Sequence, residues 1–114
     1  MRSHIRKAGD VTIVDLTGDL VVGDGDEVLG AVFEQLLAGG HTKVLLNFAH
    51  VDRMDSSGIG ELVSGWKRAK QQGIPVRLLR PGDRVRHALH LSQLLPLIEV
   101  YEGEKEALAA FATP

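Results

Sequence analysis

The segment Asp55-Ser56-Ser57-Gly58 contains the residues whose types and spacing are best suited to chemistry. It follows an apolar run and precedes residues with helical periodicity, which places both serines at a helix N-terminus. Aspartate and serine oxygens at such a position accept hydrogen bonds from free backbone amides, worth ~1 kcal/mol. A serine hydroxyl there is also accessible to a kinase, and the helix dipole and amides can hold an added phosphate. The segment is therefore a helix cap, a phosphoacceptor or both, and capping physics suits either serine.

Two glycines, Gly58 and Gly60, stand in the first turn of this predicted helix. Each costs a helix about 1 kcal/mol relative to alanine. Capping alone does not account for them, so we expect another group to approach the backbone closely. That group belongs either to a neighbouring strand or to a partner protein.

Other chemical sites receive little support from the residues. The chain lacks the Gly-x-Ser-x-Gly elbow of serine hydrolases. Gly23-Asp24-Gly25 is not followed by the Gly-Lys-Ser/Thr of a phosphate-binding loop. His87 and His90 can share a helix face, but no ligand-type side chain stands at suitable spacing, which favours surface histidines over a metal site. We expect no catalytic residue, no metal and no cofactor, and a protein that is not an enzyme.

The apolar periodicity predicts the elements that position this segment. Residues 18–25 are expected to form a loop, with Asp24 and Glu27 as a capping pair for the next helix. Strands are predicted at 5–7, 11–17, 43–49, 76–79 and 97–101, and helices at 26–38, 57–72, after Pro81-Gly82-Asp83, and at 104–111. This order predicts an α/β domain: a mixed, mostly parallel sheet with an N-terminal hairpin, covered by about four helices.

Several apolar residues carry further expectations. The second long helix is expected to bury a stripe at helical spacing: Ile59, Leu62, Val63, Trp66 and Ala69. Four leucines provide more apolar surface than a short helix and strand need: Leu91, Leu94, Leu95 and Leu97. They could support self-association, although core packing is favoured, and we expect a monomer or a weak dimer. The basic residues Arg77, Arg80, Arg84 and Arg86 are expected to form a solvated face rather than to meet an acidic partner.

Composition excludes several classes of protein. At 114 residues the chain is expected to form one domain, residues 1–114, and the absence of cysteine excludes disulfides. No apolar stretch approaches the roughly 20 residues of a membrane span, and no secretion signal is recognisable. A net charge of −2 and 4% aromatic residues argue against direct nucleic-acid binding. We therefore expect a cytoplasmic protein with no membrane and no nucleic-acid partner.

The run from Val44 to Leu62, VLLNFAHVDRMDSSGIGEL, closely resembles the signature of STAS-domain anti-sigma-factor antagonists. Leu16-Thr17-Gly18-Asp19-Leu20 resembles the first loop of that family, and the predicted element order agrees with the family fold. The chain departs from better-known antagonists just after this loop, where Val21-Val22-Gly23-Asp24-Gly25-Asp26 replaces an acidic and polar stretch.

The resemblance implies that Ser56, the first serine of the pair, is phosphorylated by an anti-sigma factor that is itself a serine kinase using ATP. The unphosphorylated antagonist would bind this kinase and release the sigma factor, and a phosphatase would reset the switch. The resemblance further implies a partner-binding surface around the phosphosite, formed by Asp19, Leu20, Met54, Asp55, Ser57, Gly58 and Gly60.

Two alternatives remain open at the level of sequence. STAS domains also serve as non-switching scaffolds of sensory complexes and as accessory subunits of lipid transporters. A small α/β protein that binds or hydrolyses nucleotides is the third hypothesis. The retained serine favours the phosphorylated group.

Overall fold

The computed structural model describes residues 1–112, which form a single α/β domain. The strands are β1 (Arg2–Ala8), β2 (Val11–Leu20), β3 (Val44–Met54), β4 (Val76–Leu79) and β5 (Val100–Tyr101). The helices are α1 (Gly25–Ala38), α2 (Ser56–Gln71), α3 (Asp83–Leu91) and α4 (Glu104–Phe111). The predicted order of elements and the predicted fold class are confirmed.

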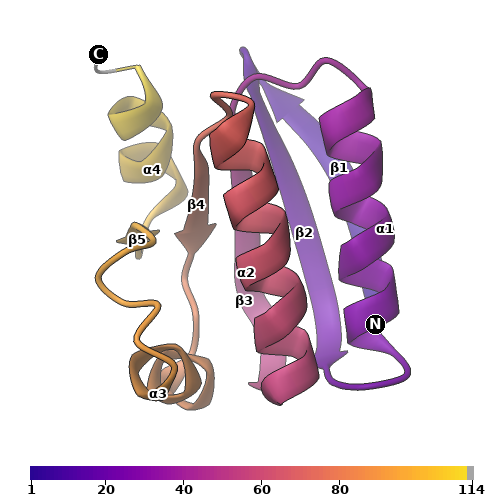
Figure 1. The fold of residues 1–114 in the computed structure, drawn as a ribbon. Coiled ribbons are helices and arrows are strands. Elements are labelled where there is room, and N and C mark those ends of the chain that lie inside the picture. The colour runs from indigo at the N-terminus through magenta and orange to yellow at the C-terminus, as the bar shows by residue number, and fades with distance from the viewer. Residues whose placement is uncertain (113–114) are drawn as a thin grey trace.

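The five strands form one sheet in the order β1-β2-β3-β4-β5. β1 and β2 pair antiparallel, whereas each later neighbour is parallel. Parallel neighbours need a crossover between them, and the helices supply it. Figure 1 shows α1 and α2 side by side over the sheet, with α2 beginning at the end of the sheet where β2 and β3 end.

The core lies on both faces of the sheet because alternate residues of each strand point to opposite sides. Val14 and Leu46 pack with α1, α2 and α3 in the larger cluster. Ile13 and Leu45 pack with Ala107 and Phe111 of α4 in the smaller one. Only the short helix α4 covers this second face among the described residues, so part of that face is polar.

Three strands, β1, β2 and β3, are longer than the sequence predicts. Gly18 and Leu20 continue β2 through pairs with Val51 and Met54, so residues 18–20 and 50–54 are strand rather than loop. The register shifts twice along this extension, which explains why no simple alternation marks it. As a consequence, β3 leads directly to the start of α2, and the end of β2 is paired beside it.

Four smaller expectations are wrong. Asp24 does not cap α1, since its backbone angles of φ −141° and ψ −89° lie outside the usual N-cap region, and its carboxylate contacts the amino group of Met1 instead. Leu91 is 68% exposed because α3 ends there and Leu94 takes the buried place. Ile59 is half-buried and belongs to neither core cluster. β5 is shorter than predicted, and Leu97, which was expected in it, is 65% exposed.

Candidate functional site

The start of α2 is held against the tip of β2. The Asp55 amide donates to the Leu20 carbonyl at 3.2 Å. Gly58 lies so close to this strand that an added Cβ would stand 2.1 Å from the Leu20 carbonyl oxygen. A neighbouring strand therefore accounts for one of the two first-turn glycines. Gly60 is exposed with no atom of residues 1–112 near the place of its missing Cβ, so the fold does not require a glycine there.

Asp55 is the N-cap of α2 and connects it to the β2–α1 loop. One carboxylate oxygen accepts from the Gly58 amide at 3.0 Å, and the other accepts from the Val22 amide at 3.0 Å. These amides, first that of Val22 and then that of Gly58, hold the pKa of the Asp55 carboxyl below its usual range. Asp55 thus performs the capping role that the sequence left open among three residues.

The two serines differ in their surroundings. Ser56 is exposed at the first position of α2, and its hydroxyl has no hydrogen bond to the part of the chain that the structure describes. Ser57 is half-buried one position further along the helix. The Ser56 hydroxyl therefore forms no hydrogen bond that stabilises residues 1–112.

Apolar and charged side chains lie around the start of α2. Val22 is 66% exposed, and Met54 and Ile59 are half-buried beside the start of α2. Asp19 forms an ion pair with Arg53 at 3.0 Å. The sequence reasoning missed Val22, although an apolar residue in a turn rich in glycine and aspartate is itself a signal of an exposed contact.

The predicted partner-binding residues separate by exposure. Gly60 is exposed, and four others are half-buried: Asp19, Met54, Asp55 and Ser57. Leu20 and Gly58 are buried, so they support the backbone of the site instead of presenting side chains to a partner.

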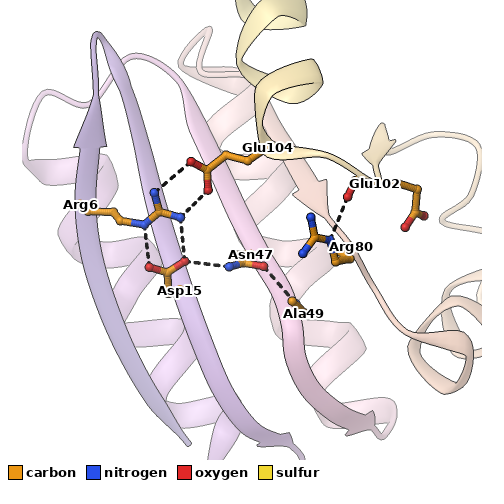
Figure 2. Close-up of polar contacts among 7 residues, drawn as sticks. All are labelled: Arg6, Asp15, Asn47, Ala49, Arg80, Glu102 and Glu104. Carbon is orange, nitrogen blue, oxygen red and sulfur yellow. Dashed lines mark hydrogen bonds and ion pairs between the residues drawn. The ribbon is translucent and has the colours of Figure 1, made fainter.

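A second polar cluster lies on the sheet face that α4 only partly covers (Figure 2). Arg6 pairs with Asp15 at 2.7 Å and with Glu104 at 2.5 Å, and Asn47 donates to Asp15 at 2.8 Å. The hydrogen bond from Arg6 is the main cause of the lowered pKa of both the Asp15 and the Glu104 carboxyl. Arg6 and Asn47 together donate to all four carboxylate oxygens of Asp15 and Glu104, so the cluster joins α4 to the sheet and leaves neither carboxylate unpaired. Nothing in the sequence analysis identified it.

Comparison with known proteins identifies the family. The STAS domain family model matches residues 3–107. The chain belongs to the STAS domain family. A Thermotoga neapolitana protein named as an anti-sigma factor antagonist homologue is 31% identical over 77 residues, 68% of each chain.

Solved structures show the same STAS fold. A crystal structure of a Thermotoga maritima protein, named as an anti-sigma factor antagonist, has a TM-score of 0.87 at 24% identity and covers 95% of this chain and 92% of that chain. The Bacillus cell fate determinant SpoIIAA in its phosphorylated form has a TM-score of 0.74 at 22% identity and covers 96% and 99%. Within residues 1–112 of this STAS domain, no helix has the length and apolar character needed to cross a membrane.

Proposed function

We propose that this STAS domain is an anti-sigma-factor antagonist that binds an anti-sigma factor serine kinase while Ser56 is unphosphorylated. Phosphorylation of Ser56 by that kinase ends the complex, and a phosphatase restores it. The protein then acts by binding and not by catalysis. The named Thermotoga relative and the phosphorylated solved relative support the proposal.

The observation that carries the proposal is the exposed Ser56 hydroxyl at the start of α2, which has no hydrogen bond to residues 1–112. Asp55 already caps the helix, so a kinase can modify Ser56 without removing a stabilising hydrogen bond. The half-buried Ser57 is less accessible, which favours Ser56 as the acceptor.

The electrostatic effect of a phosphate at Ser56 fits a reversible switch. It adds about −1.5 to −2 charges at neutral pH. The N-terminal end of α2 tolerates that charge, so the fold remains. A partner that covers Val22, Met54 and Ile59 must instead desolvate the phosphate beside the Asp55 carboxylate, which is costly.

The test uses tagged protein as bait in lysate of its own source cells, followed by identification of captured kinases. We expect wild type and Ser56→Ala to capture an anti-sigma factor, which phosphorylates wild type on Ser56 when ATP is added. Ser56→Asp should bind at least about tenfold more weakly in calorimetry while its far-UV CD spectrum remains that of wild type.

Ser64→Asp is the matched control, because Ser64 is an exposed serine of the same helix two turns away. It should bind the kinase like wild type. Equal binding by Ser56→Asp and wild type would contradict the switch, as would phosphate on Ser57 alone. Capture of a large assembly that Ser56→Ala and Ser56→Asp join equally would favour a scaffold role.

A further inference from the structure

The turn between β2 and α1 presents an apolar side chain to solvent. Figure 1 shows this turn beside the start of α2. Val22 is 66% exposed in it, next to the exposed Gly23 and Asp24. Within residues 1–112 two other large apolar side chains are similarly exposed, those of Leu91 and Leu97, and both belong to the segment from α3 to β5. Val22 differs from them because its backbone amide donates to the N-cap of α2.

Backbone contacts hold the turn in place. The Val22 amide donates to the Asp55 carboxylate at 3.0 Å. The Val21 carbonyl accepts from the Asp26 amide at 3.2 Å. At Gly25 an added Cβ would stand 2.3 Å from a carbonyl oxygen of β2, so the end of the turn is packed tightly against that strand. A turn that is already ordered lets a partner bury the Val22 side chain at a lower entropic cost.

The surroundings of Val22 indicate what kind of surface fits it. Its exposed neighbours Gly23 and Asp24 give the apolar side chain a polar rim, and protein interfaces commonly combine an apolar centre with such a rim. The valine side chain has no hydrogen-bonding group, so it suits an apolar pocket. Val22 and Ser56 are both joined to Asp55, the first through a hydrogen bond and the second through a peptide bond. A protein that reaches the Ser56 hydroxyl therefore also meets Val22.

We propose, on the basis of the function proposed above, that Val22 is a docking residue for the anti-sigma factor serine kinase. The kinase buries the Val22 side chain in an apolar pocket beside the site where it binds Ser56. A kinase without such a pocket binds this STAS domain more weakly, so Val22 determines which kinase is recognised. The side chain has no group that can accept or donate a proton in phosphoryl transfer. Its loss therefore raises the KM for phosphorylation and leaves kcat unchanged.

The test uses Val22→Thr, which keeps the β-branched shape and the backbone amide but replaces a methyl group with a hydroxyl. Calorimetry compares the binding of wild type and variant to the purified kinase that the wild-type bait captures, and phosphorylation of Ser56 is followed at increasing concentrations of each protein. We expect Val22→Thr to weaken binding and to raise the KM about fivefold or more, because the hydroxyl must be desolvated in an apolar pocket. Its kcat and far-UV CD spectrum should be those of wild type, since the side chain is exposed in the free protein.

Leu91→Thr is the matched control, because Leu91 is 68% exposed at the end of α3 and the change introduces the same polar residue. It should bind the kinase and be phosphorylated like wild type. Equal effects of the two variants would indicate a general loss of apolar surface and would refute the docking role. Unchanged binding by Val22→Thr, with Ser56→Asp still weakening the complex, would overturn the role of Val22 and leave the proposed function standing. If wild type captures no kinase that phosphorylates Ser56, both proposals are wrong.

Discussion

Asp55 fixes the geometry of the candidate site through two backbone amides, one from its own helix and one from the β2–α1 loop. The sequence predicted a cap at this position but could not choose among Asp55, Ser56 and Ser57. That choice depends on where β3 ends, and the pairing of Leu20 with Met54 sets this end. The types and spacing of the side chains predict that a cap forms here, whereas the pairing of β2 with β3 decides which residue forms it.

The first prediction concerns Asp55 and pH. The pKa of the Asp55 carboxyl is lowered in the fold, so its charged form stabilises the fold fully when the pH is above the ordinary aspartate pKa near 3.9. This stabilisation is lost as the pH falls through the lowered pKa of the folded state. Asp55→Asn should therefore lower the thermal midpoint at pH 7 and show a smaller deficit at pH 2.5. Asp55→Ala should lower the midpoint further, since it removes both acceptors.

The control for this prediction is Asp52→Asn, which alters an exposed carboxylate with no hydrogen bond to residues 1–112. Its thermal midpoint should match wild type at pH 7. Deficits of Asp55→Asn that are equal at pH 7 and pH 2.5 would mean that the carboxylate charge does not contribute.

Among the elements, the extension of β2 and β3 is the feature that places Ser56. The buried part of each strand was predicted from apolar patterns, but residues 50–54 alternate polar and apolar side chains irregularly. Gly18, with φ of +117°, and two register shifts interrupt the same stretch of β2. Such a segment is a strand only because another strand pairs with it. That partner strand is distant in the sequence, so the local residues do not reveal the pairing.

The second prediction uses the two first-turn glycines of α2 as a pair. Gly58→Ala forces a methyl group against the Leu20 carbonyl and should destabilise the fold by about 1–3 kcal/mol. Gly60→Ala meets open space and should stabilise the helix by up to about 1 kcal/mol. Urea unfolding followed by Trp66 fluorescence measures both values.

Binding gives these variants a second readout. If Gly60 faces the partner, Gly60→Ala should be more stable than wild type and bind the anti-sigma factor more weakly. Stability changes of the same sign for the two variants would contradict the assigned contacts of Gly58 and Gly60.

For the molecule as a whole, strand–helix alternation was enough to predict the parallel strands, because parallel neighbours need a crossover, and two consecutive strands predicted the hairpin. The ion pairs that connect distant parts of the chain could not be predicted. Arg6 and Glu104 stand 98 positions apart, and only the finished sheet brings β1 and the start of α4 together.

The third prediction concerns acid stability. Arg6 lowers the pKa of the Asp15 and Glu104 carboxyls. The two carboxylates therefore stabilise the fold fully when the pH is above their ordinary pKa values near 3.9 and 4.3, and this stabilisation is lost as the pH falls through the lowered pKa values. Glu104→Gln should lower the thermal midpoint at pH 7. Between pH 5 and pH 2 the midpoint of this variant should fall less steeply than that of wild type. Glu106→Gln, an exposed change in the same helix, should follow the wild-type curve. Parallel curves for wild type and Glu104→Gln would rule out this role.

The bond between Val22 and Asp55 has a consequence for evolution. The fold uses only the backbone amide of Val22, whereas the side chain is 66% exposed. Any residue except proline supplies the same amide, so natural selection can exchange this side chain without loss of the helix cap. If the proposed partner covers Val22, position 22 is thus a place where related STAS domains can change a partner contact at little cost in stability.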